Sequence, residues 1–171
     1  MKTVCGLDIA SLKSGCAVID GNETHLYSLI LDAKTPLEER IYRHLIWSEV
    51  IAARHDIEIC FIEEVLHVHH GGGYHENGKF ENIRTGLLIS QCVGAVKAGF
   101  HGCIIYPLPP SEWRKLTVGN ISSPKGTSER TALKARAIAY ARAHGVEPRN
   151  DDEAEAFAIC KAGLILTEET A

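Results

Sequence analysis

The sequence lacks any apolar run as long as the roughly 18 residues that a membrane-spanning helix needs. Its first residues hold one basic side chain, Lys2, and reach Asp8 before the apolar core of a secretory signal peptide could form. Internal repeats and low-complexity segments are absent as well. Without a membrane-spanning run or a signal-peptide core, a membrane partner and secretion are not expected, so we expect a cytoplasmic protein.

Closely spaced cysteine pairs are also missing. The six cysteines lie far apart, mostly within apolar segments, and none forms a C-x-x-C motif. This pattern is typical of free thiols that pack as small apolar side chains, rather than of disulfides or a cysteine-based zinc site.

Length and composition fit an ordinary globular protein. The 171 residues are 45% apolar and 23% charged, which suggests one domain over residues 1–171. The net charge of -4 argues against a wholly basic nucleic-acid-binding protein. However, residues 110–149 contain eight Lys or Arg and three acids. This segment forms either a solvated helical face or a phosphate-contacting surface, and the second reading requires catalytic acids beside it.

Hydrophobic periodicity predicts an α/β protein. Strands are expected at residues 3–10, 14–20, 25–31, 57–65 and 103–106, the first three as an antiparallel meander. Five helices should flank them, at residues 36–55 with Thr35 as N-cap, 82–98, 111–116, 128–144 and from 150 onward. Gly86, Ser90, Gly94 and Ala98 form a stripe of small residues that would let another backbone approach, in the core or across a dimer.

Carboxylates stand at three points of this pattern. Asp8 lies in the first apolar strand, where a buried charge would be costly without a partner, so it either caps its own turn or binds metal. Glu63 and Glu64 end the fourth strand, and Asp152 and Glu155 share one face at the head of the last helix. Favourable charge at a helix N-terminus is the simpler explanation of the helical pair. Taken together, the acids suit Mg²⁺ or Mn²⁺, and a pair of such ions about 4 Å apart commonly hydrolyses phosphodiesters.

This order of elements, with Ile-Glu-Glu-Val at residues 62–65 and Asp-Glu-Ala-Glu-Ala-Phe-Ala-Ile at residues 152–159, resembles the ribonuclease H-like superfamily. Within it, the chain is most similar to RuvC-type Holliday junction resolvases, especially phage and prophage forms. Leu-Thr-Val-Gly at residues 116–119, followed by Lys125, also resembles the loop before that family's penultimate helix. The resemblance implies a ribonuclease H-like fold with a five-stranded mixed sheet flanked by helices.

The resemblance also implies a site and a reaction. Asp8, Glu63, Asp152 and Glu155 would bind two Mg²⁺ ions, with Mn²⁺ as a possible substitute, and Lys125 would stabilise phosphate charge. A homodimer would then resolve four-way DNA junctions by paired symmetric nicks that leave 5′-phosphate and 3′-hydroxyl ends. Glu155 stands where the family commonly has aspartate, so Asp151 remains a competitor for this role.

Further DNA contacts are expected from residues around the acids. The Gly- and His-rich segment 67–78 matches no zinc-ligand spacing, and we interpret it as a DNA-facing loop in which Tyr74 stacks on a base. Lys125, together with Arg130 and Lys134 of the basic helix, would contact the DNA backbone.

Three other functions stay open at this point. The chain could be a nuclease of the same fold that cuts branched or flap DNA in general, or structured RNA. It could be a noncatalytic nucleic-acid-binding scaffold, which the presence of all four acids disfavours. A fragment of an actin-like kinase would need a second domain, which 171 residues do not provide.

Overall fold

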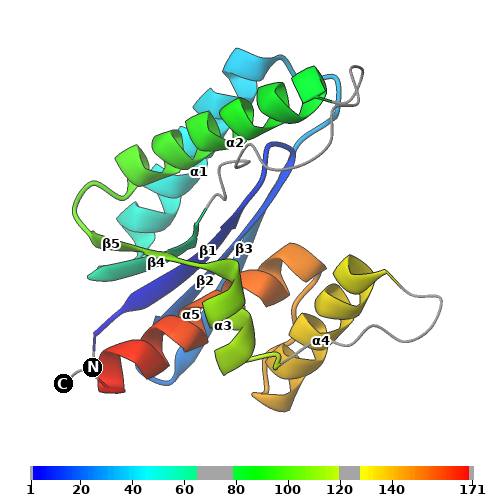
Figure 1. Cartoon of the computed structure of the whole chain (residues 1–171). Coiled ribbons are helices and arrows are strands. Elements are labelled where there is room, and N and C mark those ends of the chain that lie inside the picture. The colour runs from blue at the N-terminus through cyan, green and yellow to red at the C-terminus, as the bar shows by residue number, and fades with distance from the viewer. Residues whose placement is uncertain (1, 65–78, 120–127, 170–171) are drawn as a thin grey trace.

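A computed structural model of the chain describes residues 2–64, 79–119 and 128–169, except for the side chains of residues 79–85 and 169. Five strands and five helices follow one another in these residues, and the helices cover both faces of a single sheet (Figure 1). Within this described part of the chain, no helix has the length and apolar character required to cross a membrane.

The sheet has the strand order β3-β2-β1-β4-β5. Strand β1 (Val4–Ile9) pairs antiparallel with β2 (Lys13–Asp20), and β2 pairs antiparallel with β3 (Glu23–Ile30). On the other side, β4 (Ile59–Glu63) runs parallel to β1, and β5 (Ile104–Leu108) runs parallel to β4. The predicted five-stranded mixed sheet and its initial meander are therefore confirmed.

Helices α1 (Leu37–Arg54) and α2 (Lys79–Gly99) pack against each other on one face of the sheet (Figure 1). The prediction that Thr35 caps α1 is wrong, because Pro36 occupies the N-cap position and no side chain caps the helix. The Arg40 side chain instead donates a 2.8 Å hydrogen bond to the Thr35 carbonyl and holds the preceding turn against the helix.

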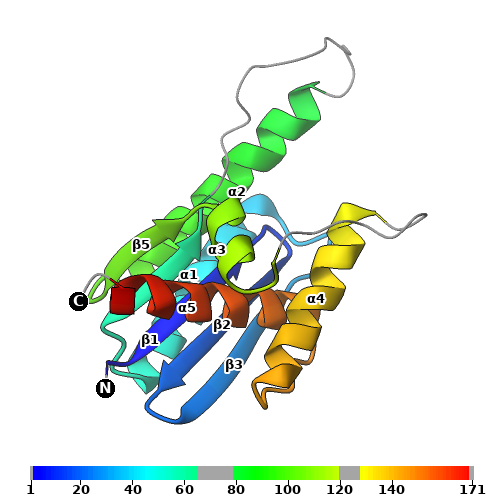
Figure 2. The same cartoon turned by 60° about the horizontal axis from the view of Figure 1, so that its bottom comes forward.

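Helix α5 (Asp151–Glu169) lies across the opposite face, over β1 and β2. It is flanked by α3 (Pro110–Leu116) and α4 (Glu129–Ala143), and α4 runs beside the N-terminal half of α5 (Figure 2). All six cysteines are free and five are buried, as their spacing predicted.

Small residues let α5 lie directly on the sheet. A Cβ atom added to Gly6 on β1 would overlap with the Ala156 carbonyl, and one added to Gly15 on β2 would overlap with the Asp152 carbonyl. The helix contributes fully buried alanines, including Ala154 and Ala158, to the same contact. The first turns of α5 consequently lie next to the end of β1, which carries Asp8.

Candidate metal centre

Asp8 and Glu63 stand near the same end of two adjacent parallel strands. Leu7 pairs with Ile62 across β1 and β4, and both of these side chains belong to the core beneath α1 and α2. Because side chains alternate along a strand, the residues that follow them, Asp8 and Glu63, face α5. The sheet register thus places both predicted acids on the face where the last helix begins.

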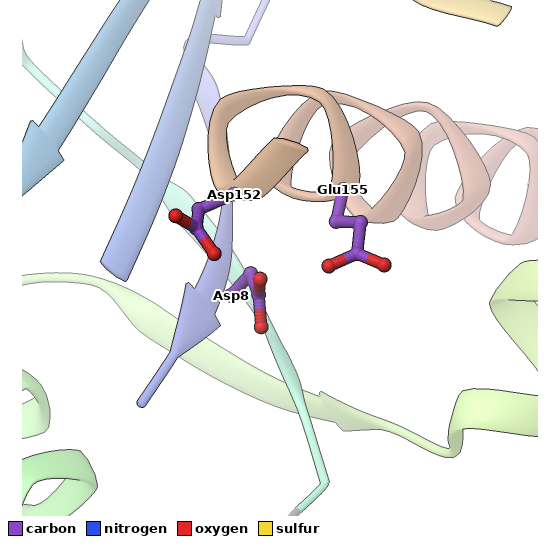
Figure 3. Close-up of side chains that lie close together, drawn as sticks. All are labelled: Asp8, Asp152 and Glu155. Carbon is purple, nitrogen blue, oxygen red and sulfur yellow. The ribbon is translucent and has the colours of Figure 1, made fainter. Parts of the chain in front are cut away.

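Helix α5 adds two further carboxylates to this place. Oxygen atoms of Asp8, Asp152 and Glu155 lie within 4.8 Å of one another. Figure 3 shows the three side chains converging, one from the strand and two from the first turns of the helix. Three of the four predicted metal ligands are therefore brought together, and Glu63 is held beside them rather than among them.

The close group of acids is electrostatically strained. Burial raises the pKa of Asp8 well above its usual value, and the neighbouring Glu155, Glu63 and Asp152 raise it further. Burial is also the main reason why the pKa values of Asp152 and Glu155 are raised. A bound divalent cation would relieve this repulsion, and carboxylate oxygens are the donors that Mg²⁺ and Mn²⁺ prefer, so the residues present fit such an ion.

The remaining acids at the head of α5 have structural partners. Asp151 forms an ion pair with Lys134 of α4. Glu153 is fully buried and accepts a 2.9 Å hydrogen bond from Nε of Arg149, while its own backbone N–H donates to the Asn150 side chain. Asn150 therefore caps the helix, and Glu155 rather than Asp151 faces Asp8.

Glu63 is oriented by α3. Nε1 of Trp113 donates a 2.9 Å hydrogen bond to Oε2 of Glu63, and the Arg114 guanidinium lies 3.8 Å from Oε1. Burial raises the pKa of Glu63, and Arg114 and Trp113 oppose this increase. The Trp113 side chain is fully buried in the core.

Sequence reasoning missed the roles of Trp113 and Arg114 at this site. A signal was available, because α3 follows β5 directly and β5 runs parallel to β4. The start of α3 must then lie at the same end of the sheet as Glu63.

The acids line an open cleft of about 490 Å³. Three basic side chains also line it, Arg114 from α3 and Arg130 and Lys134 from α4, together with the acid Glu129. Arg130 is exposed, whereas Lys134 is half-buried and engaged with Asp151. The other two predicted DNA contacts, Tyr74 and Lys125, lie outside the described residues.

Comparison with known proteins points to one fold. No protein-family model matches the chain, and no curated protein matches it. Among solved structures, the chain is similar to Thermus thermophilus RuvC in complex with a Holliday junction substrate, with a TM-score of 0.69 and 17% identity over 99% of this chain and 96% of that chain.

The Thermus thermophilus RuvC structure also matches, with a TM-score of 0.68 and 19% identity over 98% of this chain and 96% of that chain. Sequence identity this low supports a statement about fold. The chain has the ribonuclease H-like fold of the RuvC resolvases, as the order of its elements and acids predicted.

Proposed function

We propose that this protein is a divalent-metal-dependent endodeoxyribonuclease that resolves four-way DNA junctions, leaving 5′-phosphate and 3′-hydroxyl ends. The observation that carries the proposal is the convergence of Asp8, Asp152 and Glu155 within 4.8 Å. These acids line a cleft that also contains three basic side chains, in a fold shared with RuvC. An acidic centre beside cations suits a substrate that is itself a polyanion.

Each acid would have a defined part in holding the metal. Asp8, Asp152 and Glu155 would bind it directly, and Glu63 would complete the site from β4. Two Mg²⁺ or Mn²⁺ ions, when bound, would supply a metal-activated water and stabilise charge on the leaving oxygen. Trp113 and Arg114 would hold the Glu63 carboxylate in one orientation through their contacts with both of its oxygens.

Basic side chains around the acids would position the DNA. Arg130 and Lys134 from α4 would contact phosphates along the cleft, and Arg114 would do so from α3. We retain Lys125 as a phosphate contact near the cut and Tyr74 as a base-stacking residue. The phosphate contacts would fix the position of the DNA backbone in the cleft, because most protein–DNA hydrogen bonds go to phosphate and sugar oxygens.

Paired nicks require two active sites, so we propose a homodimer that uses α2. A Cβ atom added to Gly86 or Gly94 meets nothing within 4 Å among the described atoms, so these glycines are not needed for packing in the described chain. Leu87 beside them is 61% exposed. Sedimentation of wild type and Gly94→Glu tests this: we expect a dimer and a folded monomer, respectively, and a Gly94→Glu dimer would contradict it.

The reaction is tested by cleavage of a synthetic four-way junction, with a matched linear duplex and a flap as competitors, in Mg²⁺ or Mn²⁺. Wild type should nick the junction symmetrically. Asp8→Asn should bind the junction without cutting it. Glu58→Gln is the matched control, because Glu58 is an exposed acid just before β4, at the opposite end of that strand from Glu63.

The product pattern separates the possible substrates. Equal cutting of flaps would replace junction resolution by a general branched-DNA nuclease activity. Binding without cutting in either metal would indicate a noncatalytic scaffold. Cutting by Asp8→Asn at the wild-type rate would contradict the proposed centre.

A further inference from the structure

His44 of α1 is fully buried and reaches the turn that follows Asp8. Its Nε2 lies 2.9 Å from the carbonyl oxygen of Ala10 and 3.0 Å from the hydroxyl of Ser14. Its Nδ1 lies 2.7 Å from the carbonyl oxygen of Arg40, one turn earlier in the helix. The ring therefore connects α1, on one face of the sheet, with the turn between β1 and β2.

Ser14 closes the same turn from the other side. The Ala10 N–H donates a 3.1 Å hydrogen bond to the Ser14 hydroxyl, which in turn lies 3.0 Å from the Ala10 carbonyl oxygen. The Ser14 side chain is fully buried as well. Both polar groups of the Ala10 peptide backbone are thus bound by two buried side chains, one of them from a distant helix.

Burial of these polar side chains is less favourable than burial of apolar side chains of the same size would be. A buried imidazole that loses its hydrogen bonds destabilises a protein, whereas an apolar side chain of similar volume avoids that cost. Nδ1 faces the Arg40 carbonyl oxygen, and Nε2 faces both the Ala10 carbonyl oxygen and the Ser14 hydroxyl, so each ring nitrogen has a polar partner within hydrogen-bond distance. The contacts point to a need for a fixed polar partner at Ala10 that apolar packing alone would not meet.

Ala10 has a direct connection with the candidate metal centre. It lines the cleft together with Asp8, and only Ile9 separates the two residues. Ile9 is held in register with Ser14 on β2, so the backbone from Asp8 to Ala10 is bound along its length. A shift of Ala10 would turn the last part of β1 and move the Asp8 carboxylate relative to Asp152 and Glu155, which come from α5 on the other face.

We propose that His44 is a positioning residue that holds the Ala10 carbonyl and thereby orients the Asp8 carboxylate for metal binding. The inference rests on the proposed role of Asp8 as a metal ligand. It assigns the contact between Nε2 of His44 and Ala10 to the support of the metal centre, although the buried ring itself does not line the cleft. Replacement of a side chain that orients a metal ligand through hydrogen bonds typically lowers metal affinity by about 10- to 100-fold.

The test compares His44→Gln, His44→Leu and Ser14→Ala with wild type. Glutamine can present an amide N–H where Nε2 stood, while leucine fills a similar volume without a donor. Mn²⁺ binding to the metal-free proteins is measured by calorimetry, with the melting temperature of each protein as the measure of folding. Asp8→Asn gives the background, since it removes a proposed ligand.

We expect His44→Leu to bind Mn²⁺ about 10-fold or more weakly and His44→Gln to bind within a few-fold of wild type. Ser14→Ala changes one small side chain and should lower affinity several-fold even if His44→Leu fails to fold. Wild-type affinity in a folded His44→Leu or in Ser14→Ala overturns the proposal, as does equal loss in the Gln and Leu variants. Because binding is measured without DNA, failure of wild type to cut junctions would count against the proposed function and leave this result unaffected.

Discussion

Gly15 on β2 lies against the backbone of Asp152, so closely that a Cβ atom at position 15 would overlap with the Asp152 carbonyl. This contact fixes how near the head of α5 can approach the sheet. Asp8 pairs with Gly15 across β1 and β2, so the glycine lies directly beside the strand acid and beneath the helix acid. The spacing of the acidic group therefore depends on the absence of a single methyl group.

Gly15→Ala should displace the start of α5 and lower both stability and activity. Overpacking of this kind costs about 1–3 kcal/mol, which denaturant unfolding would measure. Junction cleavage should fall more than stability alone explains, because Asp152 and Glu155 move away from Asp8. Gly102→Ala is the matched control, since its added Cβ meets nothing within 4 Å. Equal effects of the two substitutions would contradict this account.

Glu155→Gln should reduce cleavage far more than Asp151→Asn. Glu155 belongs to the close acidic group, whereas Asp151 is paired with Lys134. Removal of residues that only orient ligands costs about 10- to 100-fold, so removal of a ligand should cost at least about 100-fold. Rates under single-turnover conditions, with Mn²⁺ and Mg²⁺ compared, give the measurement. A larger loss for Asp151→Asn would assign the fourth ligand to Asp151.

Asp8→Asn should stabilise the metal-free protein at neutral pH. The pKa of Asp8 is raised in the folded state, so between its ordinary and raised values the folded protein binds more protons than the unfolded chain. Stability is therefore lost as the pH rises through this range and regained as it falls. The melting temperature of Asp8→Asn should exceed that of wild type at neutral pH, with a gap that narrows on acidification.

Added Mg²⁺ should make the melting temperature of wild type higher than that of Asp8→Asn. Mg²⁺ binds the folded wild type, and a concentration 100 times the dissociation constant stabilises by about 2.7 kcal/mol. Asp8→Asn should gain little from the same addition. Thermal melts with Mg²⁺ and with a chelator, over about pH 4 to 8, distinguish the two effects. A wild-type melting temperature that is insensitive to metal would count against the site.

Trp113→Phe should weaken metal binding by about 10- to 100-fold while the protein remains folded. Phenylalanine keeps most of the buried ring but removes the Nε1–H that donates to Glu63. Because this hydrogen bond lowers the pKa of Glu63, its loss should also move the acidic limb of the cleavage pH profile upward. Trp47→Phe is the control for loss of an indole elsewhere. An unchanged pH profile would contradict the proposed effect of Trp113 on Glu63.

Arg130→Ala should weaken junction binding and reduce its salt dependence. Arg130 is exposed on the cleft wall, and each phosphate contact contributes about -0.9 to the slope of log K against log salt. The slope should therefore become shallower by about one. Arg142 lies in the last turn of the same helix and pairs with Glu147, so Arg142→Ala is the matched control. Equal slopes for both variants would place the DNA elsewhere.

Much of the fold was predictable because it follows from local patterns. Alternating apolar residues marked the strands, and turn residues such as Gly21 separated them into a meander. The resemblance implied a five-stranded mixed sheet, but the parallel pairing of β1 with β4 became evident only in the structure. The prediction that Thr35 caps α1 is wrong because Pro36 occupies the N-cap position. Arg40 binds the Thr35 carbonyl instead, a contact that helical spacing does not reveal.

The candidate site was likewise predictable from the sequence only in part. The sequence alone determined which acids were available, in the first strand, at the end of the fourth strand and at the head of the last helix. The choice of Asp8, Glu63, Asp152 and Glu155 among them came from the resemblance to RuvC-type resolvases. Only the tertiary structure decided how they are used. It paired Asp151 with Lys134 and buried Glu153 against Arg149, and it brought Glu155 to Asp8.

The physical reason is that a helix presents its acids in several directions, and only its neighbours determine which of them lose water and acquire partners. The same holds for Trp113, His44 and Gly15, whose importance lies in atoms contributed by distant parts of the chain. Periodicity reports the face on which a residue lies. The close approach of α5 to the sheet, set by glycine and alanine on both sides, determines what that face meets.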